Sequence, residues 1–132
     1  MPVLDTEVLF AISPNDAKHA QAMSLLRSTN DLVVPDTAFI EFQMVLRARN
    51  ISSVKIKEAM LDISAVLSEN GVKEVRTVGS SLVVTQCELE SRYGLTFFDS
   101  FIAASALSLD AVVVSDDSSF DLVPGLGRIP LR

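Results

Sequence analysis

The stretch from Phe97 to Phe120 constrains the fold more than any other part of the chain, because its pattern is that of a helix followed by a buried strand. Its first half predicts a helix from about residue 98 to residue 109. Asp99, Ala103 and Ala106 share one face of this helix. The two alanines therefore allow the helix backbone to lie close to the element that it covers.

An unbroken apolar run at residues 111–114 follows this helix and is typical of a strand that is buried on both faces. Ser115, Asp116 and Asp117 come directly after it. In open parallel sheets, ligands bind just beyond the carboxyl ends of the strands. The stretch therefore predicts an acidic site at such an edge.

Short apolar segments alternate with helical patterns along the rest of the chain. The predicted strands lie at about residues 2–4, 32–34, 73–76, 111–114 and 128–131. The predicted helices begin at residue 6, at Asn15 or Asp16, at Asp36 or Thr37, at Ser52 or Ser53, at Ser80 or Ser81, and at residue 98. This alternation indicates an α/β fold whose mainly parallel sheet of four to five strands is covered by helices on both faces.

At 132 residues the chain is expected to form a single domain over residues 1–132. Its apolar share of 48% is high, which we interpret as two-sided burial of the sheet plus a subunit interface. No apolar run approaches the ~18 residues of a membrane span, and the start of the chain lacks the features of a signal peptide. The one cysteine, Cys87, is expected to be a small core residue, and the reducing cytoplasm is the default compartment.

The net charge of −6 argues against a protein that binds nucleic acid by charge alone, but it allows a nuclease whose metal ions carry the positive charge. The single histidine, His19, excludes histidine-rich metal sites. Because His19 shares a helix face with Met23 and Leu26, a structural role is favoured over contact with RNA.

Each acid near a predicted strand or helix end also has an ordinary structural interpretation. Asp5 follows the first strand and also suits a helix cap. Glu41 interrupts an apolar run, where an unpaired buried charge is costly, but the exposed edge of an amphipathic helix would hold it too. Asp99 has the spacing of a capping-box acid, and the pair at residues 116 and 117 also suits a turn.

Taken together, these acids indicate one site. If the two strands that end in acid are neighbours, their ends lie about 4.8 Å apart. Four ionised carboxylates about 5 Å apart repel one another by roughly 3 kcal/mol per pair, and the sum exceeds the ~5–15 kcal/mol stability of a typical domain. Such a cluster must take up protons or a divalent cation, and an all-oxygen site suits Mg²⁺ or Mn²⁺. These ions support the attack of water on a phosphodiester.

Four motifs follow one another along nearly the whole chain. LDTEVLF carries Asp5, PDTAFIEF carries Glu41, LTFFDSFIAASAL carries Asp99, and VVSDDSSFDLVPGLGRIPL carries Ser115 and Asp117. In this order and spacing they resemble the PIN domain family, in particular its small toxin ribonucleases of the VapC type.

The resemblance implies a three-layer α/β/α fold and a metal-dependent endoribonuclease that acts on structured or single-stranded RNA. It implies one or two Mg²⁺ or Mn²⁺ ions that are held by Asp5, Glu41, Asp99 and Asp117. Ser115 matches a residue that supports the last acid, and Asp116 matches a supporting position that is often Asn. Members of the family are commonly homodimers, and its toxins pair with an antitoxin that is encoded alongside.

The chain departs from the family at Glu7, where Asn or Ser is common, and this extra carboxylate either tunes metal binding or faces solvent. The stretch from Ser52 to Gly94 matches no motif, which leaves RNA specificity open there. The basic side chains at residues 47–57 either contact RNA phosphates or an antitoxin, or else serve a helix end and the solvent. They are Arg47, Arg49, Lys55 and Lys57.

Two rival families fit poorly. Asp5-Thr6-Glu7 faintly resembles a phosphatase start, which needs a second Asp in place of Glu7. The pair Asp116-Asp117 faintly resembles a receiver domain, in which the acids follow the first strand and not the fourth. The hypotheses that remain are a metal-dependent ribonuclease with a toxin role, a housekeeping nuclease that processes tRNA or rRNA, and a catalytically silent PIN-like module that binds RNA or a protein partner. The four intact acids favour a nuclease, since a scaffold gains nothing from their repulsion.

Overall fold

A single parallel sheet forms the centre of this protein, whose computed structural model describes all 132 residues. Its five strands are β1 (Val3–Leu4), β2 (Val33–Pro35), β3 (Lys73–Val75), β4 (Val112–Val114) and β5 (Gly127–Ile129). They lie in the order β3-β2-β1-β4-β5, and every neighbouring pair is parallel. The predicted sheet is therefore confirmed.

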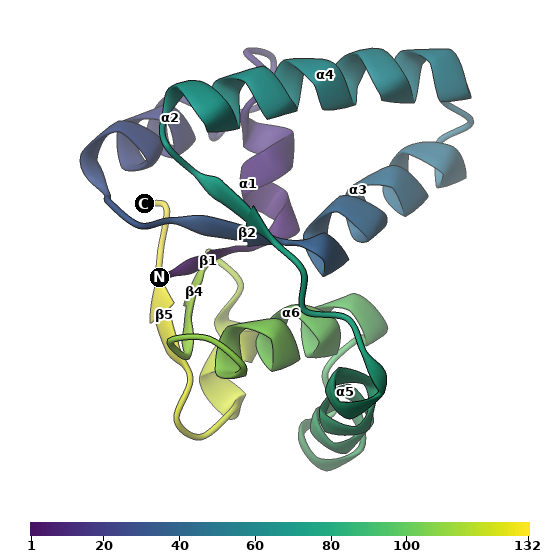
Figure 1. Cartoon of the computed structure of the whole chain (residues 1–132), viewed down its shortest axis with the longest axis vertical. Helices are drawn as coiled ribbons and strands as arrows, with labels where there is room; N and C mark the ends of the chain where they lie inside the picture. The colour runs from purple at the N-terminus through teal and green to yellow at the C-terminus, as the bar shows by residue number, and fades with distance from the viewer.

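Helices connect the strands and cover both faces of the sheet. They are α1 (Thr6–Ala11), α2 (His19–Ser28), α3 (Asp36–Ala48), α4 (Ser53–Glu69), α5 (Ser80–Tyr93), α6 (Phe97–Leu107) and the short 3₁₀ helix η1 (Ser118–Leu122). Figure 1 shows α1, α2 and α4 on one side of the sheet and α5 and α6 on the other, while α3 leads away from the end of β2. This is the three-layer α/β/α arrangement. None of the helices combines the length and the apolarity that crossing a membrane would need.

Strand β1 lies at the centre of the sheet with β4 beside it, and both are buried, as their apolar sequences predict. Their core residues Val3, Leu4, Val113 and Val114 are fully buried. Helix α6 packs against both strands, and its Ala103 and Ala106 are also fully buried. The small-residue face thus brings α6, with the acid in its first turn, close to the centre of the sheet.

The structure corrects two expected boundaries. Helix α2 begins at His19, because Asp16 accepts the backbone N–H of Lys18 at 2.8 Å and so forms a turn before the helix. Strand β5 ends at Ile129, because the backbone N–H of Leu131 turns away from the sheet and donates to Asp116 Oδ1 at 2.8 Å.

The prediction that Cys87 is a core residue is wrong, since this residue is exposed. The inward position beside it belongs to Gln86, which is 2% exposed. Gln86 Nε2 donates to Ser100 Oγ at 2.9 Å and so ties α5 to α6. The interface between these two helices therefore contains the hydrogen-bonded amide of Gln86, and not the side chain of Cys87 that was expected in the core.

Candidate active site

The ends of β1 and β4 bring Asp5 and Ser115 together. Leu4 lies opposite Val114 in the register of this strand pair, so the residues that follow the two strands face one another. Ser115 Oγ donates to Asp5 Oδ2 at 2.7 Å, and the backbone N–H of Thr6 donates to Asp5 Oδ1 at 2.7 Å. Asp5 therefore caps α1 and also lies at the sheet edge where the sequence predicts a site.

The loop after β4 places Asp117 beside this pair. Its backbone N–H donates to Ser115 Oγ at 3.0 Å, so one hydroxyl joins the loop to Asp5. Asp117 Oδ1 accepts the backbone N–H of Ser119 at 2.9 Å and caps η1. Ser115 thus contacts the side chain of one predicted ligand and the backbone of another.

Glu41 reaches the same edge from α3, which packs against α1. Thr6 Oγ1 donates to Glu41 Oε1 at 2.5 Å. Since the backbone N–H of Thr6 also binds Asp5, one residue orients two carboxylates. Glu41 is half-buried and hydrogen-bonded, so it is not the fully exposed edge of an amphipathic helix. The sequence analysis did not identify Thr6, whose type and position carry no special signal.

Asp99 lies in the first turn of α6, where its backbone N–H donates to Thr96 Oγ1 at 3.3 Å. Thr96 therefore caps α6, as the spacing of the two residues predicts. Helix α6 also packs against α3, which carries Glu41. The local role as a helix start and the position near the other acids are compatible.

Three carboxyl groups at this edge have raised pKa values. Burial raises the pKa of Asp5 to about 7, and the charges of Asp99 and Glu7 add to the rise. Burial and the charge of Asp99 raise the pKa of Glu41. Burial raises the pKa of Asp99, and so do the charges of Asp117 and Glu7. Acids from α1, α3, α6 and the loop after β4 therefore lie close enough for the charge of one to affect the pKa of another.

The donor atoms at this edge are carboxylate oxygens, which are the ligands that Mg²⁺ and Mn²⁺ prefer. The side chains do not form a ready-made cluster of three ligands around one point. A divalent cation would nevertheless offset the negative charge of Asp5, Glu41 and Asp99, whose pKa values are raised mainly by burial and further by neighbouring charges. The chemistry of the donors and their charge therefore fit such an ion.

A second group of charged residues lies beside these acids, and the sequence analysis does not predict it as a unit. Glu7 Oε1 accepts the backbone N–H of Asp116. Lys18 Nζ lies 3.4 Å from Glu7 Oε2 and 2.8 Å from Asp116 Oδ2. The hydrogen-bonded Lys18 ammonium holds the pKa of Asp116 below its usual range, in contrast to the raised values of the other acids. Asp116 thus directs its side chain toward Lys18, and its backbone toward Glu7.

The remaining candidates have structural contacts. His19 Nδ1 lies 2.9 Å from the carbonyl oxygen of Ala11 and so joins α2 to α1. The guanidinium of Arg49 lies over the ring of Phe10, 5.4 Å from its centroid. The histidine contact agrees with the structural interpretation of His19, and Arg49 contacts an aromatic ring.

Comparison with known proteins identifies the family. The sequence profile of the PIN domain matches residues 3–126. A search of curated protein sequences found no match.

Several solved structures have the same fold. VapC20 of Mycobacterium tuberculosis, a Sarcin-Ricin loop cleaving toxin, is 18% identical, with a TM-score of 0.71 over 92% of this chain and 93% of its own. VapBC2 of Rickettsia felis, bound to a DNA fragment from its promoter, gives 19% identity and a TM-score of 0.69 over 97% and 96% of the two chains. A toxin-antitoxin complex from Klebsiella pneumoniae gives 13% identity and a TM-score of 0.69 over 100% and 98%.

At these identities the structural similarities establish the fold alone. The profile match, in contrast, spans nearly the whole chain and includes Asp5, Glu41, Asp99 and Asp117. The five-stranded parallel sheet agrees with that match. The chain therefore belongs to the PIN domain family.

Proposed function

We propose that this protein is a metal-dependent endoribonuclease that hydrolyses RNA phosphodiesters, with Mg²⁺ or Mn²⁺ held by Asp5, Glu41, Asp99 and Asp117. The observation that carries this proposal is the set of carboxyl groups at the sheet edge, three of which have pKa values raised by burial and by neighbouring charges. Keeping ionised carboxylates buried near one another costs stability unless a cation offsets their charge. Membership of the PIN family supports the same class of reaction.

The chain's own residues orient the proposed ligands. Ser115 Oγ and the backbone N–H of Thr6 fix the two oxygens of Asp5, and Thr6 Oγ1 fixes Glu41. Because the pKa of Asp5 is about 7, this carboxyl group holds a proton part of the time at neutral pH, and cation binding releases that proton. When bound, the ions supply the Lewis acidity that the attack of water on a phosphodiester needs.

We also propose that the protein is the toxin of a toxin–antitoxin pair, acting in the cytoplasm as a homodimer that a small antitoxin protein controls. The similarly folded VapC20 is described as a toxin, and the structure from Klebsiella pneumoniae is a toxin-antitoxin complex, which supports this role. A housekeeping PIN nuclease that processes tRNA or rRNA would have the same chemistry. A small antitoxin reading frame next to the gene would favour the toxin, and a gene without such a neighbour would favour the housekeeping enzyme.

The second candidate is a catalytically silent PIN-like module that binds RNA or a protein partner. The observation in its favour is that no three carboxylates surround one point. This candidate predicts that the acids are dispensable for binding. The nuclease predicts that they are indispensable for cleavage.

Cleavage of a mixed-sequence single-stranded RNA by the purified protein tests the proposal. We expect cutting with Mn²⁺ and none with EDTA, because the acids alone do not activate water. Asp99→Asn should abolish cutting and keep the fold. Asp62→Asn, which removes one carboxylate from the exposed side of α4, should cut at the wild-type rate.

Two outcomes would contradict the nuclease. Cutting that survives EDTA or the Asp99→Asn substitution would refute the mechanism based on the four acids. If no RNA is cut, a calorimetric titration with Mn²⁺ decides. Binding that Asp99→Asn abolishes would indicate the wrong RNA, whereas a protein that binds no Mn²⁺ would be the silent module.

A further inference from the structure

Glu7 lies beside the four acids, yet both of its carboxylate oxygens already have partners. Oε1 accepts the backbone N–H of Asp116, and Oε2 lies 3.4 Å from Lys18 Nζ. The side chain is 28% exposed, so it is largely held in the protein. The two oxygens of Asp5 accept hydrogen bonds only from neutral groups, whereas Glu7 is already paired with a cation, the ammonium of Lys18, and this points to a different role for Glu7.

The group that Glu7 holds belongs to the loop between β4 and η1, which carries Asp117. Ser115 Oγ links the start of this loop to Asp5 at 2.7 Å. The Glu7 hydrogen bond links the next residue, Asp116, to helix α1. Asp117 follows immediately, and its own backbone N–H donates to Ser115 Oγ at 3.0 Å. Two links therefore set the position of Asp117. One joins the loop to Asp5, the residue that caps α1, and the other joins the loop to Glu7 in α1.

Lys18 completes the second link. Its ammonium group bridges Glu7 Oε2 and Asp116 Oδ2 at 3.4 Å and 2.8 Å. The side chain of Asp116 is 5% exposed, and its Oδ1 accepts the backbone N–H of Leu131 at 2.8 Å. Lys18 thus pairs with two carboxylates at the point where α1, the loop and the C-terminal segment meet, and Arg132 Nε lies 3.6 Å from the Oδ2 of Asp116.

We infer that Glu7 is a positioning residue, whose Oε1 holds the backbone N–H of Asp116 so that the loop presents Asp117 to Asp5 and Asp99, while Lys18 offsets the charge of Glu7. The part that concerns cation binding rests on the proposed function. Positioning requires a hydrogen-bond acceptor at residue 7, whereas a role as a fifth ligand would require a negative charge. A neutral side chain that still accepts a hydrogen bond at residue 7 would therefore preserve the positioning role but abolish a role as a ligand.

Glu7→Gln and Glu7→Ala form a matched pair, since both remove the charge and only glutamine keeps an acceptor. In the metal-free protein, the amide hydrogen of Asp116 should exchange with solvent about tenfold faster in Glu7→Ala than in the wild type. In Glu7→Gln the rate should stay within about threefold of the wild type. An unchanged exchange rate in Glu7→Ala would overturn the inference, whatever the metal does.

Calorimetric titration with Mn²⁺ tests the consequence for the site. Glu7→Ala should weaken Mn²⁺ binding about tenfold, as is usual for the loss of a residue that orients a ligand, and Glu7→Gln should restore most of it. Equal losses in both variants would mean that Glu7 acts through its charge, which would overturn the positioning role. If Glu7→Ala does not fold, Glu7→Met fills the same space without an acceptor and should show the same loss.

The two proposals fail in different ways. A wild-type protein that binds no Mn²⁺ refutes the proposed function, and the exchange rate of the Asp116 amide then still decides whether Glu7 holds the loop. The opposite result is that Asp99→Asn abolishes Mn²⁺ binding, while Glu7→Ala binds Mn²⁺ as tightly as the wild type. This result would uphold the nuclease and refute the positioning role of Glu7.

Discussion

Asp5 combines a helix cap and a site position in one buried side chain, which is 6% exposed. Its hydrogen bonds from Thr6 and Ser115 stabilise the ionised carboxylate. Burial acts in the opposite direction and outweighs them, so the pKa rises to about 7. At neutral pH this residue is therefore balanced between its two protonation states, and its charge responds to any cation nearby.

The first prediction concerns pH. The pKa of Asp5 in the folded state is about 7, above the ordinary value of 3.8. The protonated group therefore stabilises the fold fully below pH 3.8, and this contribution is lost as the pH rises through about 7. We therefore expect the melting temperature of the wild type minus that of Asp5→Asn, both measured in EDTA, to fall over this pH range. Saturating Mn²⁺ should reduce the fall. If the melting temperature of the wild type instead rises relative to that of Asp5→Asn as the pH increases in EDTA, the linkage is contradicted.

The second prediction concerns Asp99. Burial disfavours its ionised carboxylate, and so do the charges of Asp117 and Glu7, so Asp99→Asn should stabilise the metal-free protein at pH 7 by about 1 kcal/mol. In Mn²⁺ the order should reverse, because only the wild type gains stability from the ion. Urea denaturation with EDTA and with Mn²⁺ measures both differences. The exposed Asp62→Asn serves as the control, and equal behaviour of the two variants would show that position 99 has no special repulsion.

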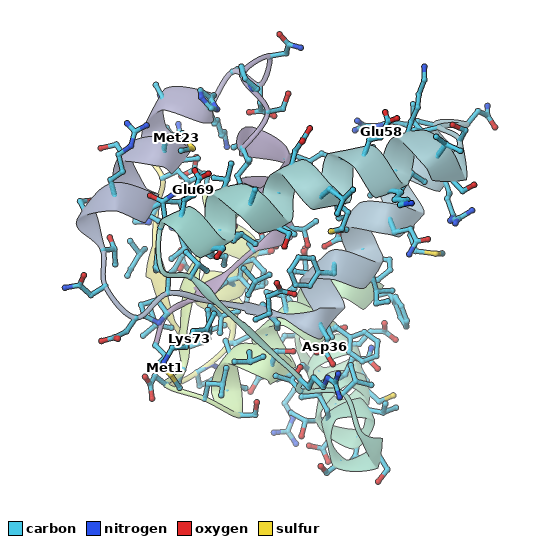
Figure 2. The ribbon with its side chains drawn as sticks, turned by 45° about the horizontal axis from the view of Figure 1, so that its top comes forward. Met1, Met23, Asp36, Glu58, Glu69 and Lys73 are labelled. Carbon is cyan, nitrogen blue, oxygen red and sulfur yellow. The ribbon has the colours of Figure 1, made fainter.

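At the scale of the elements, Asp36 shows how one side chain fixes the helices that supply two of the four acids. It is the first residue of α3, and Figure 2 shows it beside the segment that leads to α5. Asp36 Oδ1 accepts the backbone N–H and the hydroxyl of Thr77 at 3.0 Å and 2.8 Å, and Oδ2 accepts the backbone N–H of Val78 at 3.2 Å. Thr77 Oγ1 lies 2.8 Å from Ser105 Oγ in α6. A polar link therefore connects α3 to α6.

The third prediction follows from this link. Asp36→Ala should lower the free energy of unfolding at pH 7 by about 2 kcal/mol, because it leaves several donors around Thr77 without an acceptor. Although burial acts against it, the hydrogen bonds lower the pKa of Asp36, so its contribution is present above pH 3.8 and is lost as the pH falls below that value. Denaturation at pH 7 and at pH 3 measures the change. Equal losses at both pH values would contradict the role of the carboxylate.

Most elements could be predicted because burial imposes a period on the sequence. The strand Val112–Val114 and the helix Phe97–Leu107 are examples, since each has one inward pattern. The pattern fails where a polar side chain takes an inward position, as Gln86 does through its bond to Ser100. The neighbouring Cys87 then lies outside, contrary to its type.

The site could be predicted in part for a related reason. Asp5 and Asp117 follow strands, and Asp99 opens a helix, so local sequence marks their positions. Lys18 has no such mark, because its partner Asp116 is far away in the sequence. The sequence shows Glu7 only as an unusual residue type, and three dimensions are needed to show that it binds the backbone of the loop.

At the scale of the whole molecule, large apolar side chains remain exposed on four helices. Examples are Ile40 and Met44 on α3, Leu61 on α4, Val84 on α5 and Phe97 on α6, which are 53%, 53%, 61%, 58% and 55% exposed. Apolar side chains of this size on the surface are available for contacts with other molecules. This surface agrees with the high apolar share of the sequence, which we interpret as a subunit interface.

The fourth prediction is that the purified protein is a homodimer. Light scattering during gel filtration should give about twice the chain mass of 14.3 kDa. EDTA should not change this mass, because the association buries apolar side chains and needs no ion. A mass of one chain across the micromolar range would refute the dimer, and a mass that falls with EDTA would implicate the acids in the interface.

The central place of β1 in the sheet also governs when the acids can assemble during synthesis. Strand β1 pairs with β2 on one side and with β4 on the other, and the bond between Ser115 and Asp5 joins residues 110 positions apart. The ribosome delivers the chain from its N-terminus, and contacts over such distances form later than local helices. A nascent chain therefore carries Asp5 and Glu41 long before they have their partners. The cluster of acids forms only when β4 and the loop behind it have left the ribosome, so a nascent chain that still lacks this segment has no complete site.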